Sequence, residues 1–188
     1  RNSRACNYFY ECLSGTLKST SGSYNWGITT SFGYLPLDNS SFFNNKMSLV
    51  DWLRQWTNND EEKEEVYIRG FLGKMLFSGD EALKSCDVLS GGEKVRCMLS
   101  KIMMGNPNVL LIDEPTNHLD LESITTFNNS LINFKGTILM STNDIAFAKS
   151  VSNRIIEITP NGFIDSYLSF DEYIKDEKII KQREKLYN

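Results

Sequence analysis

Two adjacent acidic residues, Asp113 and Glu114, end an apolar run of strand length in "NVLLIDEP". An uninterrupted apolar run of this length predicts a buried parallel strand. Open α/β sheets bind ligands at the carboxyl ends of such strands, so the acid pair lies where a ligand is expected. There Asp113 can hold a magnesium ion through water, and Glu114 can polarise a water molecule that attacks a γ-phosphate.

A second group with chemical potential, Ser90-Gly91-Gly92, opens a predicted helix a short way upstream. Adjacent glycines let backbone N–H groups close on an anion, and the helix dipole adds positive potential. Taken singly, "SGG" fits a flexible helix cap and "DE" fits a surface turn. Together, in "LSGGEKVR" (89–96) and "VLLIDEPTNHLD" (109–120), they are a far more specific signal for phosphate chemistry.

The elements that must position these groups follow from the spacing of the apolar residues. A helix is expected from Gly92 to Gly105, where Gly-Asn-Pro supplies a stop signal. Strands and helices alternate after it, which predicts an α/β layer with parallel strands. The elements expected there are strands at "GTILMS" and "RIIEIT", helices at "ESITTFNNSLINF" and "AFAKSVS", a hairpin turn at Asn161-Gly162 and one charged helix at "FDEYIKDEKIIKQREKLYN".

The first half of the chain has weaker patterns. "SYNWGITTSFGYL" (23–35) predicts strand, turn and strand, and "SLVDWLRQW" (48–56) predicts a helix. "VYIRGFLGKMLF" (66–77) is expected to be helical. It contains a Gly-Lys pair, but the spacing is too short for a phosphate loop and a methionine follows, so we expect a packed helix with an exposed lysine.

With these motifs in place, the sequence resembles the ATP-binding cassette superfamily. "LSGGEKVR" is similar to its signature motif, "LLIDEP" to its Walker B strand, and "NHLD", with His118 and Asp120, to its D-loop. The longer "DEPTNHLDLESI" resembles the ABC-F subfamily, whose members have two cassettes in tandem and act on ribosomes. The resemblance implies ATP and Mg²⁺ as cofactors, a second cassette and the ribosome or its RNA as partners, and a cytoplasmic location.

The resemblance covers nearly the whole chain and implies its organisation. The fold expected is an ABC-type nucleotide-binding domain, P-loop NTPase-like, with a mostly parallel α/β sheet, a helical subdomain and a small antiparallel β part. The chain would be the C-terminal cassette of a longer protein. The divisions expected are a truncated N-terminal part of the core at 1–46, the helical subdomain with the signature at 47–104, the α/β core at 105–170 and a charged C-terminal helix at 171–188.

The opening of the chain departs from the family pattern. A phosphate loop should precede "ECLSG", and the alignment puts Asn2 on its asparagine and Ser3 and Ala5 on glycines. Cys6 then falls on the lysine and Asn7 on the magnesium-binding serine or threonine. Cys6 cannot supply charge to the β- and γ-phosphates, and Asn7 is a poor magnesium ligand. The residues are expected to be a degenerate loop; an unrelated tail or a sequencing artefact is the alternative.

Two further positions depart from the family. Leu37 stands at the Q-loop glutamine and can neither ligate magnesium nor orient water. Asn143 stands at the switch histidine, where it can donate a hydrogen bond to a γ-phosphate but carries no charge near pH 7. The single histidine, His118, belongs to the D-loop and is expected to bridge to a partner domain. Together the departures suggest that the cassette's own site has decayed.

The motifs that match the family indicate which functions this cassette can still perform. In the family each ATP lies between the phosphate loop of one cassette and the signature of the other, so Ser90, Gly91, Gly92 and Glu93 would serve a nucleotide held by the partner. One hypothesis is an ABC-F-type ATPase domain, with Glu114 and Asn143 as catalytic positions and Asp113 as magnesium ligand. The alternatives are a non-catalytic cassette that completes a site in trans, and the ATPase subunit of a membrane transporter.

Charge, hydropathy and cysteine content limit the classes of protein to which the chain can belong. The net charge of −4 argues against bulk attraction to nucleic acid, though a local basic patch stays compatible with it. No apolar run reaches the roughly 18 residues of a membrane span, and no secretory signal leads the chain. The four cysteines are irregularly spaced, as expected for free thiols in a reducing cytoplasm.

Overall fold

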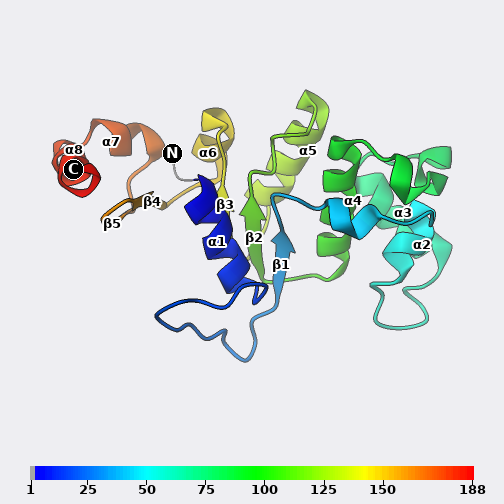
Figure 1. The fold of residues 1–188 in the computed structure, drawn as a ribbon. Helices are drawn as coiled ribbons and strands as arrows, with labels where there is room; N and C mark the ends of the chain where they lie inside the picture. Colours follow the sequence, from blue (N-terminus) through cyan, green and yellow to red (C-terminus); the bar gives the residue numbers. More distant parts are fainter. Residues whose placement is uncertain (1–2) are drawn as a thin grey trace.

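The computed structural model describes residues 3–188, so the role expected for Asn2 lies outside the described residues. Helices α2 to α4 lie at one end, a parallel sheet in the middle, and a hairpin with α7 and α8 at the other end (Figure 1). No helix in residues 3–188 is long and apolar enough to cross a membrane. The elements are α1 (Ser3–Leu13), β1 (Phe32–Leu35), η1 (Ser40–Phe43), α2 (Leu49–Arg54), α3 (Glu65–Lys74), η2 (Gly79–Leu83), η3 (Cys86–Val88), α4 (Gly91–Met104), β2 (Val109–Asp113), α5 (Leu121–Ile132), β3 (Thr137–Ser141), α6 (Ile145–Val151), β4 (Ile155–Thr159), β5 (Gly162–Ser166), α7 (Phe170–Lys175) and α8 (Glu177–Tyr187).

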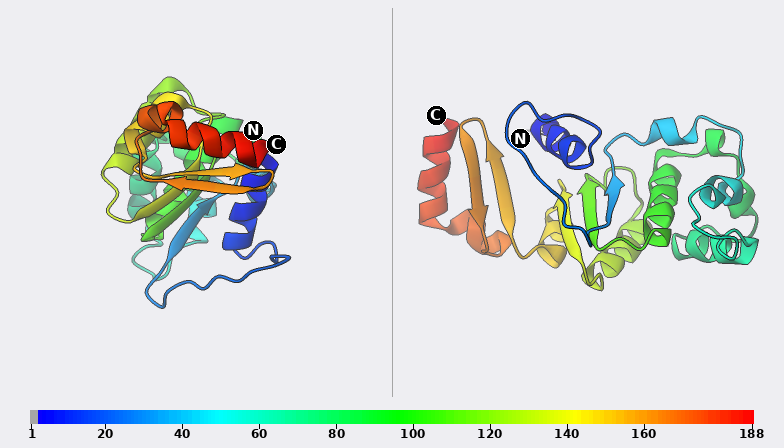
Figure 2. Two further views of the ribbon diagram at one scale, coloured as in Figure 1. Left: turned by 90° about the vertical axis from the view of Figure 1, so that its left-hand side faces the viewer. Right: turned by 90° about the horizontal axis from the view of Figure 1, so that it is seen from below.

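The central sheet has three parallel strands in the order β1-β2-β3. Strand β2 is buried from Leu110 to Asp113 because it lies between the other two strands. Helix α1 covers one face of this sheet, and α5 and α6 cover the other (Figure 2). The antiparallel hairpin β4–β5 forms a separate two-stranded sheet. The predicted fold class, a parallel α/β layer with helices and a small antiparallel part, is confirmed.

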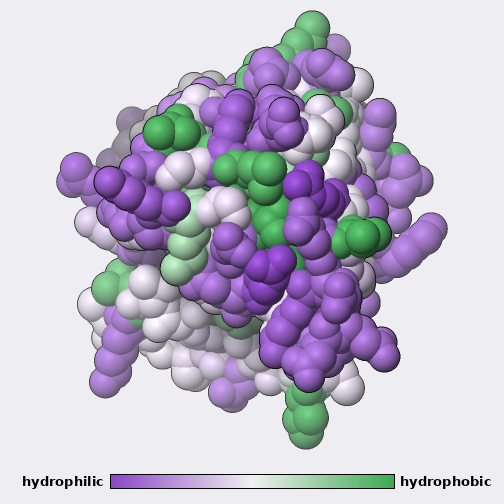
Figure 3. Space-filling model, turned by 90° about the vertical axis from the view of Figure 1, so that its right-hand side faces the viewer, coloured by the Kyte–Doolittle hydropathy of each residue, from purple (hydrophilic) through white to green (hydrophobic). Residues whose placement is uncertain are grey.

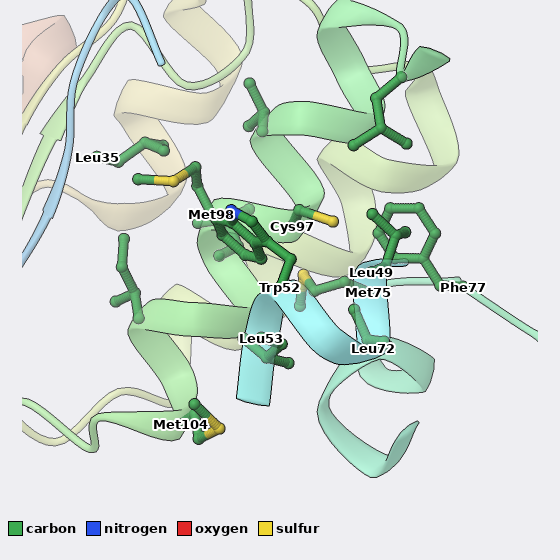
Figure 4. Packing of buried hydrophobic residues seen from close by; sticks show 14 of the residues in the cluster. Leu35, Leu49, Trp52, Leu53, Leu72, Met75, Phe77, Cys97, Met98 and Met104 are labelled. Atoms are coloured by element: carbon green, nitrogen blue, oxygen red, sulfur yellow. The ribbon is translucent and has the colours of Figure 1, made fainter. Parts of the chain in front are cut away.

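Helix α4 links the helical end to the sheet through its apolar face. Val95, Met98, Leu99 and Ile102 recur at helical spacing and are buried. They pack in one cluster with residues of α2 and α3, where Trp52 is almost completely buried (Figure 4). The outer surface of this end is mostly hydrophilic, with small hydrophobic groups among the polar residues (Figure 3). The core is therefore continuous from the helical end to β2.

The prediction of a strand before β1 was wrong. Residues 23–28 are exposed and irregular, and only Phe32–Leu35 form a strand. The segment is held by side chains instead: the Tyr24 hydroxyl bonds to the Cys12 carbonyl at 2.5 Å, and the Trp26 indole N–H bonds to the Leu13 carbonyl at 3.1 Å. A β-prone sequence becomes a strand only where a neighbour pairs with it, and among residues 3–188 no strand lies beside this one.

The last segment was expected to be one helix and is two. Helix α7 ends at Lys175, and α8 begins at Glu177. Asp176 between them has an extended backbone, with ψ of 121°, and its carboxylate accepts hydrogen bonds from the N–H groups of Lys178 and Ile179. An aspartate that caps the next helix ends the preceding one, because its own backbone leaves the helical conformation.

Candidate functional site

The signature residues form the N-terminus of α4. Ser90 is the N-cap, and its hydroxyl accepts a hydrogen bond from the Glu93 N–H at 3.3 Å. The Glu93 carboxylate in turn accepts bonds from the Ser90 N–H at 2.9 Å and the Ser90 hydroxyl at 2.7 Å. This capping box fixes the first turn of a 14-residue helix, whose N-terminus carries positive potential.

The two signature glycines lie against the D-loop of the same chain. A Cβ atom on Gly92 would lie 2.3 Å from the His118 carbonyl oxygen, so no larger residue fits without displacing the loop. A Cβ atom on Gly91 would lie 3.4 Å from the His118 ring, an ordinary contact. His118 was expected to bridge to a partner domain; its side chain is exposed and lies beside the chain's own signature.

Asp120, the other D-loop residue, has a local structural role. Its carboxylate accepts a hydrogen bond from the Ser123 N–H at 2.8 Å and caps α5. This backbone hydrogen bond lowers the pKa of the Asp120 carboxyl. The aspartate therefore fixes where α5 begins after the D-loop.

Asp113 lies at the carboxyl end of β2 and is only 3% exposed. Its Oδ1 atom accepts a hydrogen bond from the Ser141 hydroxyl at 2.5 Å, at the end of the neighbouring β3. Its Oδ2 atom is buried and has no hydrogen-bond partner among residues 3–188. Burial raises the pKa of this carboxyl, and the Ser141 bond opposes the rise. Buried oxygens are rarely left unpaired, so Oδ2 marks a place for a ligand.

Glu114 directly follows Asp113 in a strained backbone conformation. Its φ of 48° is in the left-handed region, which residues other than glycine rarely adopt. Its N–H donates to the Ser141 carbonyl at 3.1 Å, and its Oε2 atom accepts from the Asn143 N–H at 2.9 Å. The structure thus brings Asp113, Glu114 and the switch position Asn143 together at one edge of the sheet.

The positions aligned with the phosphate loop lie in a helix. Ser3 and Ala5, expected at loop glycines, already belong to α1. Without glycines this stretch has no residue that favours a phosphate-wrapping loop, and it continues the helix. Asn7 also lies in α1, where its amide N–H donates to Glu11 at 3.1 Å.

Cys6 lies on α1, which packs against β2, the strand that ends in Asp113. Burial raises the pKa of its thiol, and the carboxylates of Asp113 and Glu114 raise it further, so the thiol is neutral at pH 7. A lysine in this position would place a cation beside these carboxylates, whereas Cys6 adds none. Tyr10, one turn further along α1, is buried, and burial together with the charge of Asp113 raises its pKa.

Leu37 lies two residues beyond β1 and is 41% exposed. It offers no polar atom to a ligand. The residue that sequence analysis missed is Ser141, which holds Asp113 and also accepts the Glu114 N–H through its hydroxyl at 3.1 Å. The available signal was its place at the end of the predicted strand "GTILMS", since neighbouring parallel strands end at one edge.

The residues present fit a magnesium ion only in part. Among residues 3–188 no group of three or more His, Cys, Asp or Glu side chains could hold a metal ion alone. Mg²⁺ in nucleotide sites is bound by one or two carboxylates, with waters and substrate phosphates completing its shell. The unpaired Oδ2 atom of Asp113 fits that arrangement.

Known structures share this fold. The dimeric ATP-binding cassette MJ0796, solved in a post-hydrolysis state bound to ADP and Pi, matches with a TM-score of 0.63 at 18% identity, over 79% of this chain and 74% of that one. An archaeal ribosome recycling factor, aABCE1, solved in complex with the ribosomal stalk protein aP1, matches with a TM-score of 0.72 at 19% identity, over 97% of this chain and 35% of that one.

Sequence comparison gives closer relatives. The ABC transporter ATP-binding protein YkpA of Bacillus subtilis is 51% identical over 188 residues, which is 100% of this chain and 34% of that protein. The ATP-binding protein YbiT of Escherichia coli O157:H7 is 40% identical over 167 residues, 89% of this chain and 31% of that one. ABC transporter F family member 2 of Arabidopsis thaliana is 32% identical over 117 residues, 62% of this chain and 17% of that one.

The chain thus spans about a third or less of these relatives. The family model described as "ABC transporter" matches residues 9–117, more than half of the chain. This range includes the signature, the acid pair and the C-terminal part of α1. The chain therefore belongs to the ABC transporter family and is an ATP-binding cassette domain.

Proposed function

We propose that this chain is the C-terminal cassette of an ABC-F-type protein that couples ATP binding and hydrolysis to translation control or protection on the ribosome. The stretch "DEPTNHLDLESI" and the similarity to an F family member of Arabidopsis thaliana support the subfamily. A ribosome recycling factor among proteins of the same fold is compatible with work on the ribosome. The second cassette and the ribosome are the partners of this proposal.

The observation that carries the proposal is the asymmetry between the two halves of the site. On the phosphate side, the neutral Cys6 lies within the electrostatic reach of Asp113 and Glu114, so no cation is added where phosphate charge would accumulate. On the signature side, the Ser90 cap and its helix N-terminus are intact. We infer that the chain contributes the signature to a nucleotide held by the partner cassette, and that its own site turns over little ATP.

The residues have separate tasks in this scheme. The N-terminus of α4, which Ser90 caps, receives the anionic end of the partner's nucleotide. Asp113 offers its unpaired oxygen to a hydrated magnesium ion, which when bound would neutralise phosphate charge. Glu114 is held by the Asn143 N–H in position to orient a water molecule. Without a cation at position 6, these groups lack the charge that phosphoryl transfer requires.

The direct test measures phosphate release by the purified chain with ATP and magnesium. We expect no release above that of a Glu114→Gln variant, which keeps the shape of the side chain and removes its charge. Release clearly above that control would show a working site and refute the impaired-site proposal.

A second measurement tests the role in trans. The chain is mixed with the companion cassette that carries an intact phosphate loop, and sedimentation is followed with and without ATP. We expect faster sedimentation only with ATP, because the nucleotide joins the two surfaces. Identical sedimentation under both conditions would count against a shared site.

A further inference from the structure

Backbone hydrogen bonds fix the position of Lys84 next to the signature. Its carbonyl accepts a hydrogen bond from the Leu49 N–H at 3.1 Å, at the start of α2. Two residues further on, the Cys86 N–H donates to the Met47 carbonyl at 2.9 Å. These bonds attach the segment that leads into the signature to the chain before α2. These hydrogen bonds therefore fix the backbone position from which the Lys84 side chain extends.

The Lys84 ammonium pairs with the glutamate of the signature capping box. Its Nζ atom lies 2.8 Å from Glu93 Oε1, while Glu93 Oε2 accepts both bonds from Ser90. One carboxylate thus serves the helix cap with one oxygen and the lysine with the other. Burial raises the pKa of Glu93, but the bonds from Lys84 and Ser90 outweigh this and lower it to about 2. The carboxylate is charged at every physiological pH.

The same chain shows that such a cap needs no lysine. At the start of α7, Ser169 and Glu172 form a capping box with bonds of 3.0 Å from the Ser169 N–H and 2.6 Å from its hydroxyl. Within residues 3–188 Glu172 takes part in no salt bridge. A capping box therefore does not require a lysine. Lys84 also lies 3.6 Å from Glu81, the glutamate of another capping box at the start of η2, but its shorter contact, at 2.8 Å, is with Glu93.

At the signature, the capping glutamate would repel a bound phosphate, a problem that does not arise at the start of α7. If the N-terminus of α4 receives a phosphate group, the Glu93 carboxylate repels the anion, because it lies at the same helix end and accepts a hydrogen bond from the Ser90 hydroxyl at 2.7 Å. A helix N-terminus offers an equivalent of only about half a positive charge, less than one carboxylate takes away. A cation that pairs with Glu93 restores the balance.

We propose that Lys84 is a charge-compensating, positioning residue of the signature motif. By pairing with Glu93 it cancels the negative charge beside Ser90, so that the N-terminus of α4 can accept an anionic phosphate group. The inference rests on the proposed function, because that function brings a nucleotide phosphate to this helix. Lys84 acts through Glu93 and need not touch the nucleotide.

The test titrates the whole chain with inorganic phosphate and follows the amide NMR signals of Gly91 and Gly92. We expect Lys84→Met to weaken phosphate binding about fivefold. We expect Glu93→Gln alone to strengthen it, because the negative charge beside Ser90 is removed while Lys84, which also pairs with Glu81 at 3.6 Å, keeps its positive charge. The double variant should return close to wild type. Lys149→Met is the matched control, since Lys149 also pairs with a carboxylate, Asp171, at 2.6 Å.

A purely structural ion pair predicts a different pattern. Both single variants would then lower the melting temperature, and neither would strengthen phosphate binding. Equal phosphate affinity in wild type and Lys84→Met, or weaker binding in Glu93→Gln, would overturn the proposal. If phosphate binding follows Lys84 but ATP drives no association with the companion cassette, this inference stands and the proposed function fails.

Discussion

Gly91 and Gly92 are adjacent in the signature but meet different parts of the D-loop. At Gly92 the neighbour is a backbone carbonyl, that of His118, which cannot rotate away. At Gly91 the neighbour is the His118 ring, at a distance that tolerates a methyl group. At the scale of single residues, Gly92 therefore ties signature and D-loop into one unit, apart from any nucleotide.

This contrast gives a matched pair of substitutions. We expect Gly92→Ala to destabilise the chain by about 1–3 kcal/mol, because the new methyl group forces the D-loop carbonyl to move. Gly91→Ala should be neutral or stabilising by up to about 1 kcal/mol, since alanine favours the helix. Urea unfolding at pH 7 measures both. Equal stability of the two variants would show that the close approach at Gly92 is absent in solution.

At the scale of elements, a half-buried carboxylate joins α8 to the hairpin. Glu157 on β4 accepts hydrogen bonds from the Tyr173 hydroxyl at 2.5 Å, Arg183 Nε at 2.6 Å and the Tyr187 hydroxyl at 3.0 Å. Burial raises the pKa of Glu157, but these hydrogen bonds outweigh it and leave the pKa below its ordinary value. The clamp therefore depends on a charged Glu157.

The sign of this shift sets a pH dependence. Because the folded pKa lies below the unfolded value of 4.5, the contribution of Glu157 to stability is fully present above that pH. It is lost as the pH falls through the folded pKa. We expect Glu157→Gln to cost about 2 kcal/mol at pH 7 and to reduce the loss of stability between pH 6 and pH 3. Urea unfolding across this range, with the exposed Glu184→Gln as control, measures both effects; unchanged acid sensitivity in Glu157→Gln would contradict the assignment.

Local patterns predicted the elements that depend on local causes. Strand β2 and helix α4 follow from an apolar run and from apolar spacing with an N-cap, so the sequence was sufficient for both. The strand expected at 23–28 failed because pairing depends on a neighbour that the local sequence does not specify. The break at Asp176 was visible in principle, since an aspartate followed by a helical pattern is an N-cap signal.

In the candidate site, too, features set by local sequence could be predicted and features set by distant contacts could not. The acid pair and the signature could be located from residue types and spacing. The hold of Ser141 on Asp113, and the pairing of Lys84 with Glu93, depend on contacts between distant segments. Such contacts require the register of β2 against β3 and the path of the chain before α4, which a single sequence does not fix.

At the scale of the whole molecule, the two sides of the proposed nucleotide site have unequal chemistry. The side formed by α1 and the end of β2 has two carboxylates and the neutral Cys6. The side formed by the start of α4 has an intact cap, a compensated charge and a D-loop packed beneath it. Any association with a companion cassette should therefore depend on the second side.

Three single substitutions test this inequality. We expect Ser90→Ala to abolish ATP-dependent association with the companion cassette in sedimentation velocity, because Ser90 fixes the helix N-terminus that receives the partner's phosphate. Cys6→Ala should leave the association unchanged, because Cys6 lies on the other side of the proposed site. Ser90→Ala also removes a helix cap worth about 1 kcal/mol, so Ser169→Ala, which removes an equivalent cap on α7, serves as the control for stability. If Ser169→Ala associates normally while Ser90→Ala does not, the loss belongs to the signature surface. Association that survives Ser90→Ala but fails in Cys6→Ala would place the working half of the site on α1 and reverse the assignment.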